Sequence, residues 1–378
     1  MTTSDSSAPD SDTVLVTGGS GYLGTRVIAE LLKTGAHVRA TVRSLDSGPA
    51  LREAVRRGMG TDGTDRTDRT DRTDDDALDA GLDTGFAGLD AGFAGPDARL
   101  AGLDARLELV VASLTDDAGW DAAASGVDGV YHLASPMTHA TEDPELVITP
   151  ARDGALRVLR AARDAGVPRV VLTSSFAAVG YSPKELNADG VREYDENDWT
   201  DPETPGLPAY PRSKAVAERA AWSFIEREGG DTQLVVLNPT WIAGPTLTSD
   251  PRSSLQAFSA MLGGQMPVAP RQRFGIADVR DVASAHLAAM AAPDAAGKRY
   301  LLLADGLTTS WLGVATVLRE HFGALAAKAP TEEAPGDELP PLIIHNERAK
   351  AELGFAPRPA ETTIVETVQS MIDHGMLA

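Results

Sequence analysis

A glycine-rich segment near the N-terminus constrains the fold of this chain more than any other stretch. The sequence Thr17-Gly-Gly-Ser-Gly-Tyr-Leu-Gly24 follows a short β-branched run and precedes a segment, 22–33, with apolar residues at helical spacing. We therefore predict a strand, a tight turn and a helix. Gly18 would permit the turn, Gly21 would let the backbone approach a pyrophosphate, and Gly24 would let the helix pack against the sheet. This arrangement is typical of a dinucleotide-binding loop.

The alternation of apolar segments along the chain predicts an α/β fold. Further strands are expected at 37–42, 108–111, 129–133 and 169–173, and a long helix at 147–165. Strands that alternate with helices imply right-handed crossovers and a doubly wound parallel sheet of the Rossmann type. Ligands of such a sheet bind beyond the carboxyl ends of its strands, which places the glycine-rich loop at the candidate site.

Composition and charge exclude several classes of function. The 378 residues include 34 basic and 55 acidic side chains, a formal net charge of -21, so we expect no nucleic-acid partner and no anionic membrane surface. The absence of cysteine excludes disulfides, iron–sulfur clusters and a cysteine nucleophile, and the scattered histidines predict no metal site. Residues 1–12 lack the basic start and apolar stretch of a signal peptide. We expect them to form a disordered leader on a cytoplasmic protein.

One long segment, 58–107, interrupts the alternation of strands and helices. It contains Thr-Asp-Arg triplets and then the units AGLDTGF, AGLDAGF, AGPDARL and AGLDARL. Repeated glycine and aspartate oppose a stable coiled coil, and the nonapeptide spacing of calcium-binding β-helices is absent. We therefore expect a low-complexity surface insertion, to which we assign no function.

The end of the second expected strand indicates which dinucleotide is preferred. An NAD-dependent enzyme normally places an acidic residue there to hold the ribose 2′-hydroxyl, whereas this chain has Val42 followed by Arg43. A guanidinium at this position can pair with a 2′-phosphate and stack on adenine. We therefore predict NADPH, or NADP after oxidation, as the cofactor. The alternative is that Arg43 is a solvated surface residue.

A tyrosine and a lysine at helical spacing form the candidate proton-transfer pair. Tyr210 and Lys214 lie in the segment Leu-Pro-Ala-Tyr-Pro-Arg-Ser-Lys, just before residues 215–227, which have helical spacing. Four residues apart on a helix, the two side chains share one face. The ammonium would stabilise phenolate and bring the tyrosine pKa down from about 10, so that the phenol could exchange a proton near neutral pH.

A serine at the end of the strand at 169–173 completes the candidate catalytic set. Ser174 and Ser175 both follow that strand on the ligand edge of the sheet, where a hydroxyl could polarise a substrate carbonyl. We choose Ser175. A tyrosine and a lysine at this spacing are common by chance, but the order of glycine loop, serine, tyrosine and lysine on successive elements is far rarer.

Taken together, these motifs resemble those of the extended short-chain dehydrogenase/reductases. The branch that matches contains dihydroflavonol reductases, cinnamoyl-CoA reductases and microbial aldehyde or methylglyoxal reductases. The resemblance covers most of the chain outside the insertion, and its stretches are 14–24, 38–43, 131–136, 169–179, 195–200, 210–214, 238–245 and 277–286.

This resemblance implies roles for individual residues. Ser175, Tyr210 and Lys214 would form the catalytic triad. The cofactor would contact the glycine loop, Arg43, the catalytic pair and a further set of residues: Tyr22, Leu23, Leu114, Leu133, Ala134, Ser135, Pro239 and Ile242.

Three positions depart from the family pattern. Ser113 replaces the usual aspartate beside the adenine, and Ser47 replaces a second basic residue near the 2′-phosphate. Gly180 stands where plant dihydroflavonol reductases carry a substrate-recognising asparagine, and the cysteine-containing signature of cinnamoyl-CoA reductases is absent. A plain aldehyde or ketone is therefore the expected substrate.

The resemblance also implies two structural parts. The expected dinucleotide-binding domain comprises 13–180, 210–240 and 276–299. A smaller C-terminal substrate-binding lobe would comprise the remaining segments, 181–209, 241–275 and 300–378.

The expected activity is NADPH-dependent reduction of a small carbonyl compound by a monomer or homodimer. Two other functions remain open. One is an epimerase or dehydratase of nucleotide sugars that retains NAD, against which Val42-Arg43 argues. The other is a non-catalytic NADP(H)-sensing protein, against which the intact Tyr210 and Lys214 argue.

Overall fold

A seven-stranded parallel sheet forms the centre of the computed structural model, which describes residues 12–60, 102–136, 143–250, 254–306 and 308–377. The strand order is β11-β7-β5-β4-β1-β2-β3. Their bounds are β1 Thr13–Thr17, β2 His37–Val42, β3 Leu107–Val111, β4 Gly129–His132, β5 Arg169–Thr173, β7 Gln233–Pro239 and β11 Arg299–Leu302. Because β1 lies between β2 and β4, the direction of winding reverses at β1, which is where a doubly wound sheet binds its ligand. The predicted fold class is confirmed.

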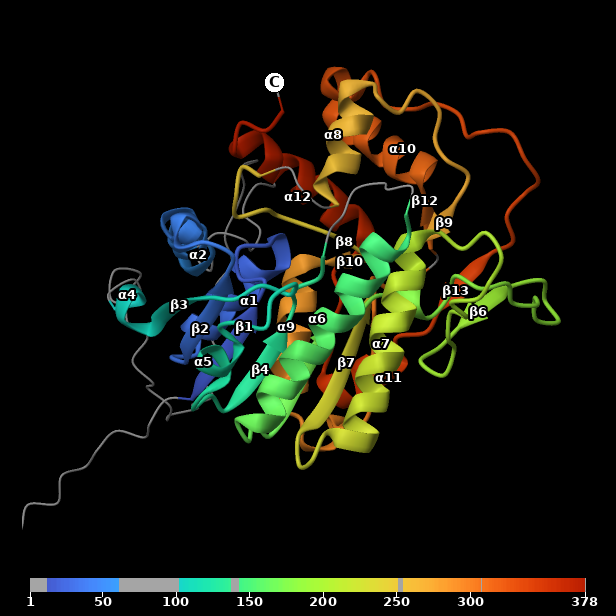
Figure 1. The fold of residues 1–378 in the computed structure, drawn as a ribbon. Coiled ribbons are helices and arrows are strands. Elements are labelled where there is room, and N and C mark those ends of the chain that lie inside the picture. Colours follow the sequence, from blue (N-terminus) through green and yellow to red (C-terminus); the bar gives the residue numbers. More distant parts are fainter. Residues whose placement is uncertain (1–11, 61–101, 137–142, 251–253, 307, 378) are drawn as a thin grey trace, which may run out of the picture.

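Helices cover both faces of this sheet (Figure 1). One face packs against α1 Tyr22–Lys33, α2 Gly48–Gly60, α9 Val279–Ala291 and α11 Glu347–Leu353. The other packs against α5 Trp120–Ala124, α6 Glu145–Asp164 and α7 Ala209–Glu228. In α1, Val27, Ile28, Leu31 and Leu32 are buried, so the periodicity seen in the sequence is the face that contacts the sheet.

A second group of elements packs around its own core at the carboxyl end of the sheet, where Figure 1 shows α8, α10 and α12 together. These helices are α8 Leu255–Gly263, α10 Trp311–Phe322 and α12 Ala360–Asp373. Short strands accompany them: β8 Trp241–Ala243 pairs with β10 Ile276–Asp278, and β9 Arg273–Phe274 pairs with β12 Thr309–Ser310. A separate pair joins β6 Arg192–Tyr194 to β13 Leu342–Ile344.

Short helical turns complete the described elements. They are α4 Leu103–Arg106, η1 Leu45–Ser47, η3 Phe176–Ala178, η4 Pro293–Ala295 and η5 Gly323–Ala326. Within the described ranges, no helix is both long enough and apolar enough to cross a bilayer.

Several boundaries of the insertion and of the two structural parts differ from those expected from the sequence. The insertion expected at 58–107 is too wide, because α2 continues to Gly60 with Met59 buried, and α4 and the first residue of β3 lie at its other end. The repeats themselves, and residues 1–11, lie outside the described residues. Residues 300–302 belong to the large sheet through β11, and α11 covers that sheet although we assigned its sequence to the lobe.

Candidate functional site

The glycine loop turns sharply between β1 and α1. Gly18 has φ +72°, and a Cβ there would lie 2.9 Å from both N and Cα of Ala134, at the end of β4. A Cβ on Gly24 would lie 2.2 Å from the carbonyl oxygen of Gly18. The space at Gly24 is therefore taken by the backbone of the loop itself rather than by the sheet that we expected. Both positions require glycine for steric reasons.

The start of α1 offers backbone donors to an anion. Gly21 is the N-cap residue and supplies no side-chain hydrogen bond to the helix. A Cβ on Gly21 would meet only the carbonyl oxygen of Gly18, 3.2 Å away, so the approach to this helix end is open. Free N–H groups and the positive end of the helix dipole favour phosphate at such a position.

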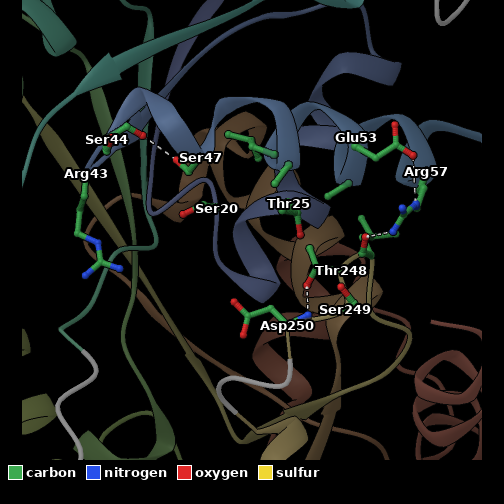
Figure 2. Close-up of a pocket in the computed structure, with 14 residues that line it drawn as sticks. Ser20, Thr25, Arg43, Ser44, Ser47, Glu53, Arg57, Thr248, Ser249 and Asp250 are labelled. Atoms are coloured by element: carbon green, nitrogen blue, oxygen red, sulfur yellow. Dashed lines mark hydrogen bonds and ion pairs between the residues drawn. The ribbon is translucent and has the colours of Figure 1, made fainter. Parts of the chain in front are cut away.

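A cavity of about 610 Å³ adjoins the loop (Figure 2). Its walls come from the loop, the end of β2, α2 and the segment after β8. The lining residues are Ser20, Thr25, Arg43, Ser44, Ser47, Ala50, Leu51, Glu53, Ala54, Arg57, Leu247, Thr248, Ser249 and Asp250. Its size and its position beside an open helix N-terminus fit one half of a dinucleotide.

Two arginines mark opposite ends of this cavity in Figure 2. Arg57 is engaged by protein groups, since it pairs with Glu53 at 3.4 Å and donates to the carbonyl oxygen of Leu247. Arg43 is exposed and has no hydrogen bond or ion pair with the part of the chain that the structure describes. Ser47 donates to the carbonyl oxygen of Ser44 at 2.8 Å and adds no charge. Arg43 is therefore the unengaged cation that could hold a 2′-phosphate.

Tyr210 and Lys214 lie in the first turns of α7, on one face of the helix. Tyr210 follows the first residue of the helix, and Lys214 Nζ lies 6.0 Å from the centre of the Tyr210 ring. The Ser213 hydroxyl donates to the carbonyl oxygen of Tyr210 and so ties this turn together. Tyr210 keeps 45% of its residue surface exposed, whereas its phenolic oxygen is enclosed by the surrounding segments.

The two serines after β5 have different surroundings. Ser174 is buried and donates its hydroxyl hydrogen to Glu218 Oε2 at 2.5 Å. Ser175 caps the short helix η3 by accepting from the backbone N–H of Ala177, and its hydroxyl lies close enough to the Tyr210 phenol to lower the pKa of that phenol. Ser175 is thus the serine that the fold brings to the tyrosine.

The charge states of this group differ from those expected from the sequence. We expected Lys214 to lower the pKa of Tyr210, but burial raises that pKa above its ordinary value, and the nearby Ser175 hydroxyl offsets the rise only in part. Burial lowers the pKa of Lys214 to about 8, against the opposing effect of Glu218. The phenol therefore carries its proton at neutral pH, as a proton donor must.

Five of the remaining predicted cofactor residues lie beside the glycine loop or at the carboxyl end of the sheet. Leu133, Ala134 and Ser135 follow β4 beside the glycine loop, and the Ala134 N–H donates to Thr17 Oγ1 at 3.1 Å. Pro239 ends β7 and Ile242 lies in β8, so both are at the carboxyl end of the sheet.

Several of the predicted cofactor residues are engaged by the protein. Leu23, Leu133 and Ile242 pack against one hydrophobic core of the sheet, and Leu114 packs against the other. Tyr22 donates its hydroxyl hydrogen to the carbonyl oxygen of Gly244.

With this geometry in place, comparisons with known proteins identify the family. The sequence profile of the NAD dependent epimerase/dehydratase family matches residues 14–302. This chain belongs to that family. Members of the family include cinnamoyl-CoA reductase 1 of Arabidopsis thaliana, which is 32% identical over 380 residues, 99% of this chain and 93% of the relative. An anthocyanidin reductase of Vitis vinifera is 36% identical over 265 residues, 65% of this chain and 74% of the relative.

Solved structures of other proteins share the fold. Yeast methylglyoxal/isovaleraldehyde reductase Gre2, determined with NADPH, superposes with a TM-score of 0.71 at 23% identity over 96% of this chain and 99% of that one. The resemblance to extended short-chain dehydrogenase/reductases stated from the sequence is therefore confirmed, and the relatives named here are reductases.

Sequence reasoning missed a group of residues that borders Tyr210. The phenol of Tyr181 is close enough to Tyr210 for the charge of an ionised Tyr210 to raise the pKa of Tyr181, and the Gln272 side chain lies beside Tyr181 and lowers that pKa. Gln272 Oε1 in turn accepts from Trp311 Nε1 at 3.3 Å. These residues come from three segments far apart in the chain, so no local motif could have predicted their meeting.

The apolar residues considered for a substrate pocket are mostly core. Phe258 and Met261 are completely buried within the core of the second group of elements. Trp241 stacks on Phe258 with ring centres 5.0 Å apart and is partly exposed. Trp241 alone of the three can therefore border a ligand.

Proposed function

We propose that this chain reduces an aldehyde or ketone to an alcohol with NADPH. The observation that carries the proposal is the meeting of Ser175, Tyr210 and Lys214 at the carboxyl edge of the sheet. The proximity of the Ser175 hydroxyl to the Tyr210 phenol supports a shared role for the two hydroxyls at one carbonyl oxygen. The reductase activities named for the relatives support the same reaction.

Each residue of the triad has a distinct task in this proposal. Ser175 orients the substrate by donating to its carbonyl oxygen. Tyr210 gives its phenolic proton to that oxygen as negative charge develops there, and its protonated state at neutral pH suits this direction of reaction. The Lys214 ammonium lies 6.0 Å from the centre of the Tyr210 ring and stabilises the phenolate that remains.

The cofactor assignment follows from the cavity beside the glycine loop. NADPH supplies the hydride, and the proton from Tyr210 completes the two-electron reduction of the carbonyl group. The N-terminus of α1 would hold the pyrophosphate. Arg43, which pairs with no other residue in the described part of the chain, would pair with the 2′-phosphate that distinguishes NADPH from NADH.

The second group of elements would form the wall facing the substrate. We propose that the segments 181–209, 241–275 and most of 300–378 act as the substrate-binding lobe. Tyr181 is its contribution beside Tyr210, Gln272 lies next to Tyr181, and Trp241 adds a partly exposed aromatic ring that stacks on Phe258. A small carbonyl compound with an apolar or aromatic body would suit these neighbours.

The decisive experiment follows NADPH absorbance as aldehydes, diketones and β-keto esters are added to the purified chain. We expect turnover, and we expect Tyr210→Phe to reduce kcat by about 10² to 10⁴ while NADPH binding is retained. Tyr300→Phe is the matched control, because it removes a phenol bonded to Glu352, away from the triad. Full activity in Tyr210→Phe would reject the mechanism. Co-purified NAD with turnover of a nucleotide sugar would instead support an epimerase, and NADPH binding without any turnover would support a sensing protein.

A further inference from the structure

A buried carboxylate lies directly behind the proposed catalytic triad. Glu218 is on α7, one helical turn beyond Lys214 and two turns beyond Tyr210, and its side chain has no exposed surface. Four donors converge on its two oxygens. Oε1 accepts from Arg299 Nε at 2.6 Å and Trp222 Nε1 at 3.3 Å, and Oε2 accepts from Ser174 Oγ at 2.5 Å and Asn238 Nδ2 at 2.8 Å.

Two of these hydrogen bonds connect Glu218 to the backbone at Ser175. Ser174 is the preceding residue, and its hydroxyl is held by Glu218. The Asn238 amide that donates to Glu218 also donates to the carbonyl oxygen of Ser175 at 3.2 Å. Glu218 is therefore linked to the peptide of Ser175 in two ways. One link runs through Ser174 at the end of β5, and the other runs through Asn238 on β7.

Arg299, on the edge strand β11, forms a buried ion pair with Glu218. Arg299 also donates to the carbonyl oxygens of Glu196 and Asp198. Its guanidinium lies 3.7 Å from the centre of the Trp199 ring. An anion so enclosed is not free to reorient, because every contact comes from an element that is itself packed.

We propose that Glu218 is a positioning residue for the reduction: its buried carboxylate fixes the peptide of Ser175 on one side and faces the Lys214 ammonium on the other. The inference rests on the proposed reductase function. A purely structural ion pair between Glu218 and Arg299 would stabilise the fold but would leave the chemistry of the folded enzyme unchanged.

The lysine provides a readout that does not depend on activity. The groups facing Lys214 are Tyr210 and Glu218 on its own helix and His132 at the end of β4. Of these, the Glu218 charge raises the lysine pKa, while burial of the ammonium lowers it. Replacing the carboxylate by an amide therefore lowers the Lys214 pKa below about 8.

The test uses the full-length chain with Glu218→Gln and the matched control Glu352→Gln. The control removes a carboxylate that bonds Lys298 and Tyr300 beside the same strand β11, away from Ser175. We expect folded Glu218→Gln to show kcat reduced tenfold or more, with NADPH affinity changed less than threefold. We also expect the ¹³Cε titration of Lys214, assigned with Lys214→Arg in the cofactor-free protein, to move to lower pH. Glu352→Gln should change neither quantity.

A milder variant keeps the inference testable if Glu218→Gln does not fold. Ser174→Ala removes only the hydroxyl through which Glu218 holds the residue before Ser175. We expect kcat to fall three- to tenfold with KM nearly unchanged, because the serine donor is displaced while the substrate surface is intact. Unchanged kcat in folded Ser174→Ala, or unchanged kcat and Lys214 titration in folded Glu218→Gln, would overturn the inference. Since wild-type turnover and its loss in Tyr210→Phe are measured in parallel, that outcome is distinct from failure of the proposed function.

Discussion

The hydroxyl of Tyr22 donates a hydrogen bond to the carbonyl oxygen of Gly244, 222 residues further along the chain. Tyr22 is the first residue of α1, and its ring packs against the core of the second group of elements. The bond therefore joins the glycine loop to the segment after β8. Because residues 247–250 of that segment line the cavity beside the glycine loop, the contact couples the two walls of that cavity.

Tyr22→Phe tests this coupling. The variant leaves the buried carbonyl of Gly244 without its partner, so we expect the free energy of unfolding to fall by about 1 to 3 kcal/mol. We also expect a severalfold increase in the Kd for NADPH, measured by fluorescence titration. Tyr194→Phe is the control, because its hydroxyl donates to Ser182, away from the cavity. Equal effects of the two variants on Kd would contradict the coupling.

Arg43→Ala tests the choice between NADPH and NADH. Loss of a charge-assisted hydrogen bond to phosphate costs about 1.5 to 3 kcal/mol, so the Kd for NADPH should rise roughly 10- to 100-fold. The Kd for NADH, which lacks the 2′-phosphate, should hardly change. Arg57→Ala, at the other end of the cavity and already paired with Glu53, should affect both cofactors alike. If Arg43→Ala raises the Kd for NADPH and the Kd for NADH by the same factor, Arg43 does not bind the 2′-phosphate.

The lowered pKa of Lys214 predicts an alkaline limit to activity. Burial places this pKa at about 8, so the lysine is charged below that pH and neutral above it. We expect kcat/KM to fall about tenfold per pH unit above pH 8, because the neutral amine no longer stabilises the phenolate of Tyr210. Lys214→Arg retains a cation that does not titrate in this range. The residual kcat/KM of Lys214→Arg should therefore not fall above pH 8. If kcat/KM falls at the same pH in both proteins, the fall comes from the titration of another group.

Two buried histidines predict a loss of stability in mild acid. Burial lowers the pKa of His286 to about 4 and that of His132 to about 3, so the folded state keeps both neutral while the unfolded state binds protons below about pH 6.5. Stability is thus lost as pH falls from about 6.5 toward 4, by up to about 3 kcal/mol for His286. His286→Gln should lose less of its stability than wild type between pH 7 and pH 4.5 in urea unfolding.

The control for this measurement is His37→Gln, because His37 is exposed at the start of β2. That variant should follow the wild-type dependence of stability on pH. If His286→Gln and His37→Gln both follow it, the acid sensitivity comes from groups other than His286.

Much of the fold could be predicted from local sequence, because apolar spacing and glycine placement act over a few residues. The bounds of α1, β2 and β5 agree with the prediction, since apolar spacing and glycine placement define where such elements begin and end. The edges of the insertion were wrong because low complexity at 61–101 masks the helix end at Gly60 and the strand start at Leu107.

The sequence by itself determined the class of fold, the glycine loop, and the placement of Tyr210 and Lys214 on one helix face. Only the tertiary structure decided which serine lies beside Tyr210. The Ser174 hydroxyl donates to Glu218, whereas the Ser175 hydroxyl lies near the phenol. It also reversed the expected direction of the Tyr210 pKa. A pKa depends on the water that all surrounding segments displace, and that burial is not encoded in the spacing of two residues along a helix.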